Sequence, residues 1–177
     1  MAQGSERSLE MLAAALEKER RGHEFYKEAL EKCSNELGKE IFRILMAEEG
    51  VHIQRVRDIY GALESGKAWT SEWQKHRVVN EDLETVCRER AARLGPMVKP
   101  DSGDLEALDI GVGMEQAAIN FYLDQEPKAV DAIEKQFITQ MIAEERSHLR
   151  ALEDLKLFFT NPESWHTEME RHGLDGA

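Results

Sequence analysis

The feature that most constrains the fold of this chain is the placement of its prolines, because proline interrupts helices. Residues 1–95 contain none, and the four prolines of the 177-residue chain lie at positions 96, 100, 127 and 162. The stretches between them are rich in Ala, Leu, Glu, Lys, Arg and Met, which favour helices, and poor in β-branched residues. We therefore predict an all-α protein.

Turn and capping signals divide these stretches into four long helices. The predicted helices and the tail after them cover about residues 8–33, 37–64, 103–126, 129–160 and 161–177. The crossover of residues 66–101 contains Trp69 and Trp73 and a further short helix, expected over Glu81–Leu94. Because a structureless loop of that length is unusual, we expect the crossover to pack on the helices. Two helical hairpins joined by one long crossover predict a four-helix bundle, in a single domain over residues 1–177.

The two predicted hairpins are related by a fixed offset of 96 positions. The seam positions of the first hairpin recur in the second without an insertion. The recurring polar residues are Glu19, Tyr26, Glu49 and His52 in the first hairpin, and Glu115, Tyr122, Glu145 and His148 in the second. The offset indicates an internal duplication of a helical hairpin, with both copies in the same helical phase.

Charged residues occupy seam positions that should be buried in such a bundle. In the first helix the seam runs through positions 12, 16, 19, 23, 26 and 30, which alternate in steps of four and three, and Glu19 lies within it. Burying an unpaired carboxylate costs several kcal/mol, and no Lys or Arg lies nearby on these seams to compensate. Either a cation is supplied from outside or the groups are protonated.

Two Glu-x-x-His pairs favour a metal. Residues three apart on a helix share a face and differ by about 4.5 Å in height, so each pair presents a carboxylate and an imidazole together. Four carboxylates and two imidazoles on four helices are the donor set of a dinuclear carboxylate site, and the carboxylates would balance two divalent ions. The predicted metal ligands are Glu19, Glu49, His52, Glu115, Glu145 and His148.

The blocks ERRGHEFY at 19–26, EEGVH at 48–52 and EERSH at 144–148 resemble the rubrerythrin-like, ferritin-like diiron-carboxylate family. The resemblance covers most of residues 9–160. It implies a ferritin-like four-helix bundle with two iron ions per chain, bridged by Glu49 and Glu145. Glu19 with His52, and Glu115 with His148, would complete the two sides. Manganese or a mixed pair would use the same ligands.

The chain also departs from that family in three ways. Its two cysteines, Cys33 and Cys87, form no C-x-x-C motif, so the rubredoxin domain of a full rubrerythrin is missing. Ala118 stands where rubrerythrins have an extra Glu, and Gly50 stands where bacterioferritins have a haem-ligating Met. We therefore expect a stand-alone diiron domain without haem, which needs an external electron donor such as a rubredoxin-type protein.

The resemblance implies a non-haem diiron oxidoreductase of the peroxidase or ferroxidase type, with peroxide or dioxygen as its substrate. The alternative is an iron-binding or storage protein with ferroxidase activity, which would need a hollow cage, whereas a homodimer would favour the enzyme. A hydroxylase of the quinone-modifying type shares the ligand pattern but would want an apolar membrane-facing patch. The mean hydropathy of −0.56 is unfavourable to that third function.

Charge and cysteine usage exclude other classes of function. The formal net charge of −12 would repel nucleic acid, so no such partner is expected. The longest apolar run, Met11–Leu16, is far too short to span a membrane. The N-terminus lacks an apolar signal segment and the two cysteines suggest no disulfide framework, so we expect a cytoplasmic location.

Two further pairs of residues lie next to the predicted ligands. Tyr26 and Tyr122 follow Glu19 and Glu115 by two helical turns. Each is either an ordinary core tyrosine or a hydrogen-bond donor to a carboxylate of the site, for which a bridging Glu would serve. Glu48 and Glu144 are either solvated or hydrogen-bonded to the ligands; the two alternatives are equally supported.

Overall fold

A computed structural model describes residues 3–78, 83–94 and 100–167 of the chain, and no strand occurs among them. Four long helices dominate: α1 (Gln3–Lys32), α2 (Glu36–Glu64), α4 (Ser102–Gln125) and α5 (Ala132–Thr160). No helix in this described part is both long and apolar enough to cross a membrane. The prediction of an all-α, ferritin-like bundle is confirmed.

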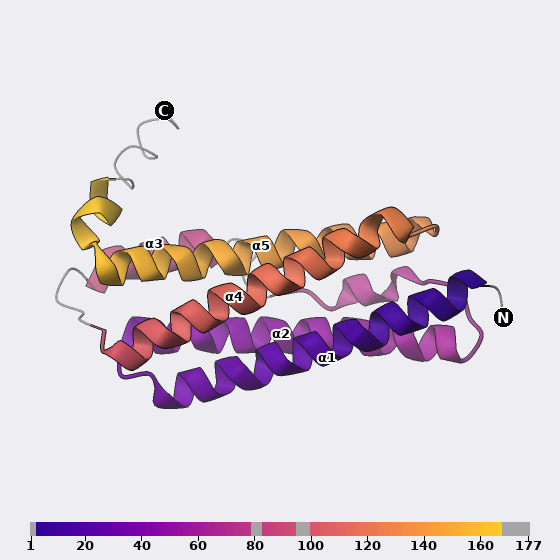
Figure 1. The fold of residues 1–177 in the computed structure, drawn as a ribbon, viewed down its shortest axis with the longest axis horizontal. Helices are drawn as coiled ribbons and strands as arrows, with labels where there is room; N and C mark the ends of the chain where they lie inside the picture. The colour runs from indigo at the N-terminus through magenta and orange to yellow at the C-terminus, as the bar shows by residue number, and fades with distance from the viewer. Residues whose placement is uncertain (1–2, 79–82, 95–99, 168–177) are drawn as a thin grey trace.

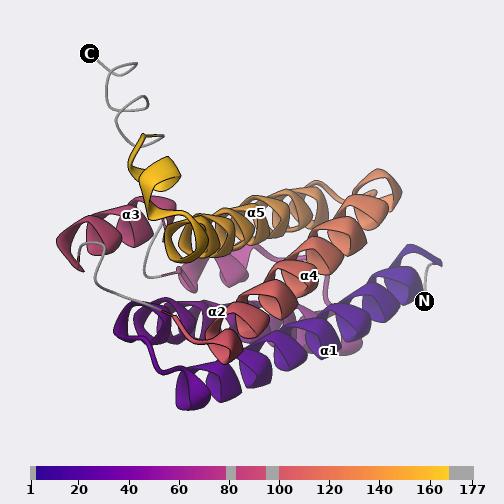
Figure 2. The same cartoon turned by 60° about the vertical axis from the view of Figure 1, so that its left-hand side comes forward.

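The four long helices form two antiparallel hairpins packed against each other. Figure 1 shows α1 and α2 as one layer and α4 and α5 as the other. Contacts between the layers join α1 to α4 and α2 to α5. The crossover returns along the length of the bundle, so α4 runs in the same direction as α2, and Figure 2 shows α4 lying alongside α1 at an angle.

Side-chain caps set the starts of three helices, as the polar turn residues suggest. Asn35 accepts hydrogen bonds from two backbone N–H groups at the start of α2. Asp101 and Asp104 form a reciprocal capping box at α4, and Asp131 accepts from the first turn of α5. These caps fix where the three helices begin after each turn.

Two predicted boundaries of the long helices differ from the observed ones by more than one residue. The last long helix begins at Ala132 and not at residue 129, because Asp131 is its N-cap and Ala129 has an extended backbone. The 3-10 turn η2 (Glu126–Lys128), which contains Pro127, fills the space before it. The first helix begins at Gln3, five residues before the predicted start at residue 8.

Polar contacts at both ends of the bundle hold the hairpins in register. The backbone N–H of Ser34, in the α1–α2 turn, donates to Asp104 at 3.1 Å, and its hydroxyl donates to the same carboxylate at 2.9 Å. At the opposite end, the Ser8 hydroxyl donates to Glu134 at 3.0 Å, and Arg7 pairs with the same carboxylate. Positions related by the 96-residue offset therefore lie at opposite ends of the bundle and come together only near its middle, because α4 runs opposite to α1 (Figure 1).

The apolar core is split into two clusters. One contains Leu45 of α2, Leu108 of α4 and Leu152 of α5, and the other contains Val56 of α2 and Met141 of α5. Along both α2 and α5, the Glu-x-x-His residues fall between the parts of the helix that belong to the two clusters. The predicted metal ligands therefore occupy a polar layer between two dry apolar regions.

The crossover and the start of the tail pack on this bundle. In the crossover, Trp73 of the 3-10 turn η1 (Ser71–Lys75) packs edge-on against Phe137, with ring centroids 5.5 Å apart. Helix α3 (Leu83–Leu94) lies against α5 and buries Leu83. Residues 162–167 form a further helical turn that buries Trp165. The remaining parts of the predicted crossover and tail (79–82, including the predicted helix start at Glu81, 95–99 and 168–177) lie outside the described residues.

Candidate metal centre

All four long helices supply side chains to the polar layer. Helices α1 and α4 contribute one glutamate each, and α2 and α5 contribute one Glu-x-x-His pair each, all with at most 3% of their surface exposed. These residues are Glu19, Glu49, His52, Glu115, Glu145 and His148. The structure thus brings together all six residues that the sequence predicts as ligands.

These six side chains form two groups of four that could each hold a metal ion. The first group is Glu19, Glu49, His52 and Glu145; the second is Glu49, Glu115, Glu145 and His148. In each group the four ligand atoms lie within 4.8 Å of one another. Glu49 and Glu145 belong to both groups, which is the arrangement required of bridging carboxylates.

The two imidazoles are oriented by carboxylates from the opposite hairpin. Nδ1 of His52 faces the cluster, 3.2 Å from Glu19, while its Nε2 lies 2.9 Å from Glu144. His148 repeats the pattern, with Nε2 2.9 Å from Glu48. A carboxylate behind a histidine fixes its ring and tautomer and leaves the other nitrogen free for a metal. Of the two alternatives for Glu48 and Glu144, the structure supports hydrogen bonding to the ligands.

Each of the two tyrosines also contacts a candidate ligand of the opposite hairpin. Tyr122 donates its hydroxyl to Glu19 at 2.5 Å, and Tyr26 donates to Glu115. Both rings are fully buried. A hydrogen bond from each tyrosine to a carboxylate of the site is therefore present. The acceptor is the glutamate of the other hairpin that belongs to one metal group only (an outer glutamate), and not Glu49 or Glu145, which belong to both. Each tyrosine lies two helical turns beyond the ligand of its own helix and so cannot reach that ligand.

Several ligand atoms in the centre have no hydrogen-bond partner. Both carboxylate oxygens of Glu145 and Nδ1 of His148 are buried and form no hydrogen bond, although Glu145 lies 3.3 Å from His148 and 3.4 Å from His52. An unpaired buried polar atom costs roughly 1–3 kcal/mol, so such atoms are rare without a reason. These atoms belong to residues of the two four-residue groups that could hold a metal. A donor set of carboxylate oxygens and imidazole nitrogens fits a pair of divalent transition-metal ions.

Charge sharing in the metal-free cluster displaces several pKa values. Burial, followed by the charge of Glu145, raises the pKa of Glu115 to about 7, and the same causes raise the pKa of Glu49. Burial opposes protonation of His52, but the neighbouring carboxylates, Glu145 first, raise its pKa above the ordinary value. Without metal, protons therefore replace part of the missing positive charge.

A buried cation lies beside the centre, at a position next to the seam and not on it. Arg55 is only 3% exposed, and its guanidinium pairs with Glu144, the carboxylate behind His52. Burial opposes ionisation of Glu144, but His52 and Arg55 together lower its pKa to about 2. Arg55 follows His52 by one helical turn, next to seam residue Val56, so the H-x-x-R spacing was the available signal.

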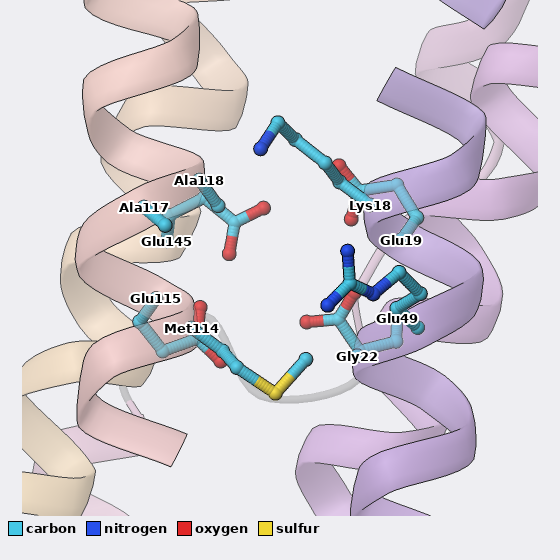
Figure 3. Close-up of a pocket in the computed structure, with 10 residues that line it drawn as sticks. Lys18, Glu19, Gly22, Glu49, Met114, Glu115, Ala117, Ala118 and Glu145 are labelled. Atoms are coloured by element: carbon cyan, nitrogen blue, oxygen red, sulfur yellow. The ribbon is translucent and has the colours of Figure 1, made fainter. Parts of the chain in front are cut away.

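A cavity of about 100 Å³ leads to the ligands between α1 and α4. Its ten lining residues are five pairs related by the 96-residue offset: Lys18 and Met114, Glu19 and Glu115, Arg21 and Ala117, Gly22 and Ala118, Glu49 and Glu145. Figure 3 shows the four carboxylates turned into the space between the two helices. The two sequence repeats therefore line the cavity with equal numbers of residues.

Small residues keep this cavity open. A Cβ atom at Gly22 would lie 3.2 Å from the carboxylate of Glu49, so a larger side chain would crowd that ligand. Ala118 occupies the matching place on α4, where rubrerythrins are expected to carry an additional Glu. The cavity has room for a small molecule next to the ligands.

The fold and the site together define a ferritin-like bundle with a candidate dinuclear carboxylate centre. A family model described as Rubrerythrin matches residues 10–156, and the chain belongs to this family. The matched region includes all six candidate ligands. No curated protein and no solved structure matches the chain.

Proposed function

We propose that this protein is a non-haem diiron oxidoreductase that reduces hydrogen peroxide, or reacts with dioxygen, with electrons from a separate donor. The observation that supports this most strongly is the pair of four-residue groups that share Glu49 and Glu145. Glu19 with His52 and Glu115 with His148 would complete the coordination of two ions. Two ferrous ions, when bound, supply the two electrons that reduction of one peroxide to water requires.

The chain's own residues would fix the geometry and limit access. Glu144 and Glu48 hold the imidazoles, and Tyr122 and Tyr26 hold the outer carboxylates, so the ligands are oriented before a metal arrives. The apolar clusters on both sides keep bulk water away from the ligands, and the cavity of about 100 Å³ admits only a small substrate. Proton uptake by the cluster is consistent with the raised pKa of Glu115.

We further propose that the electron donor is a separate small redox protein of the rubredoxin type, because the chain has no C-x-x-C motif. We also propose a homodimer in the cytoplasm. Gel filtration tests the dimer against the cage that iron storage would need: elution at the size of a dimer supports the enzyme, and a large cage supports storage.

Single-turnover oxidation by peroxide tests the proposed reaction. Protein loaded with two ferrous ions should consume one hydrogen peroxide per chain, with two protons, giving two ferric ions and two waters. The measurement is the peroxide consumed and the absorption of the ferric product, compared with the same amount of iron and the Glu145→Ala variant. Oxidation no faster than that of free iron would overturn the proposal.

A further inference from the structure

The mouth of the cavity departs from the internal symmetry of the molecule. On the α1 side it is lined by Lys18 and Arg21, and the matching positions on α4 are Met114 and Ala117. Lys18 is half-buried and Arg21 is exposed. One half of the mouth is therefore cationic and the other is apolar, although both halves lead to the same set of carboxylates.

The two cations are not used in surface ion pairs. Within the described residues neither Lys18 nor Arg21 forms an ion pair or a hydrogen bond, although α1 is rich in glutamates. The Lys18 ammonium lies 5.2 Å from the ring centroid of Phe121 on α4. Figure 3 shows its side chain extending into the opening between α1 and α4. Both charges thus remain available to a molecule that enters the cavity.

The charge balance of the loaded centre makes these two cations important. Four carboxylates balance two divalent ions, so the loaded ligand shell carries no net charge. Lys18 and Arg21 then leave the mouth positively charged, in a place where low-dielectric helices on both sides limit screening. Such a field attracts small anions and repels incoming metal ions.

We infer that Lys18 and Arg21 form an anion-binding port in front of the metal centre, which takes a small monovalent anion of the size of azide, nitrite or hydroperoxide. This inference rests on the proposed function, because the port acts on a metal-loaded centre. The same two charges slow the uptake of divalent metal through this opening. The port thus slows the entry of ferrous ion without hindering a neutral or anionic oxidant, as an enzyme requires and an iron store does not.

The internal repeat supplies the variants that test the port. Lys18→Met with Arg21→Ala gives the α1 half the residues of the α4 half, and Met114→Lys with Ala117→Arg makes the reverse change. Lys18→Arg with Arg21→Lys keeps both charges and is the matched control. None of the four positions is fully buried, so we expect all three proteins to fold and to bind two metals per chain.

The first readout is the affinity of the iron-loaded protein for azide, measured at low salt by the change in absorption. Removing both cations should weaken azide binding roughly tenfold, adding two should tighten it by a similar factor, and the control should match the wild type. At about 0.5 M salt the differences should shrink, because screening shortens the reach of the charges. Equal affinities in all four proteins at low salt would overturn the port.

The rate of Co²⁺ uptake by the metal-free protein is the second readout and involves no turnover. Uptake should be roughly tenfold faster without the two cations and slower with two added. Wild-type protein that binds two metals and reduces peroxide, with variants unchanged in both readouts, would reject the port and leave the proposed function intact. Wild-type protein that binds no metal pair would reject the proposed function itself.

Discussion

The two hairpins of the bundle match at the candidate ligands and differ in the residues around them. Inside, the 96-residue offset relates the glutamates, histidines and tyrosines of α1 and α2 to those of α4 and α5. Around these residues the match ends: Lys18 and Arg21 correspond to Met114 and Ala117, and Arg55 corresponds to Ala151. The comparison indicates that a dinuclear site requires the same ligands from both hairpins, whereas the residues that line the access to the site can differ.

The largest effect is expected from the residues that both metal groups share. Glu145→Ala removes a ligand from each group, so both ions should be lost, with affinity falling at least about a thousandfold. Glu115→Ala removes a ligand from one group only and should weaken one ion more than the other. Metal content after dialysis, measured by elemental analysis, checks both variants. Glu145→Ala protein that keeps one tightly bound ion would show that the halves act separately.

The pH dependence of stability should differ between the metal-free and the metal-loaded protein. The folded-state pKa values of Glu115 (about 7), Glu49, His52 and His148 are raised, so the folded protein holds more protons than the unfolded chain. Stability from these groups is present below their unfolded values and is lost as pH rises through the folded ones. Glu144 behaves in the opposite way, and its contribution is lost only as pH falls toward 2.

Between about pH 5 and 8 the metal-free protein should therefore become less stable. The Glu115 shift alone corresponds to about 3 kcal/mol, or roughly 6–12 °C in the thermal midpoint. Metal-loaded protein should change little, because metals replace the protons. Thermal melts of chelated and loaded protein at one ionic strength make the comparison. A chelated protein that gains stability across this range would contradict a buried carboxylate cluster.

Variants of Glu48 and Glu144, the carboxylates that contact the two histidines, compare the contributions of the two hairpins to metal affinity. Glu144→Gln and Glu48→Gln should each lower metal affinity about 10–100-fold, because each one removes the charge that orients an imidazole. Glu144→Gln should also lower stability, since it leaves the buried Arg55 without its carboxylate. Isothermal titration with Zn²⁺ and thermal melts separate these effects. Unchanged affinity in both variants would show that the carboxylates do not support the ligands.

The smallest effect is expected at the tyrosines. Tyr122→Phe and Tyr26→Phe each remove one hydroxyl that donates to an outer glutamate, at a cost of about 1 kcal/mol, or several-fold in metal affinity. Because the hydrogen bonds are crossed, each variant should weaken the ion on the side of the opposite hairpin. Metal titrations that show the ion on the same hairpin weakened would contradict the crossed arrangement.

The sequence was sufficient to predict the helices and the six candidate ligands because both are local signals. Periodic apolar positions define a helix face, and a Glu or His on that face must be buried whatever surrounds the helix. The start of α5 was predicted three residues early, since Ala129 and Val130 are compatible with a helix and the cap at Asp131 outweighed them.

The surroundings of the centre could not be predicted in this way, because they depend on how the hairpins pack. Tyr26 reaches Glu115 and His52 reaches Glu144 only through the crossing of the two layers. Arg55 lies off the seam by sequence spacing, and its burial follows from the packing of Trp73 in the crossover, whose ring lies 5.7 Å from the guanidinium carbon. The cationic half of the mouth likewise emerges only when α1 and α4 are placed side by side.

The central claim is that the two hairpins build one shared dinuclear centre, and a metal titration of the wild-type protein tests it most directly. Chelated protein titrated with Co²⁺, followed by absorption and by elemental analysis, should take up two ions per chain. The second ion should bind at least as tightly as the first, because the first ion already orients Glu49 and Glu145, which belong to both groups. Saturation at one ion per chain, or two ions that bind independently, would contradict the shared centre.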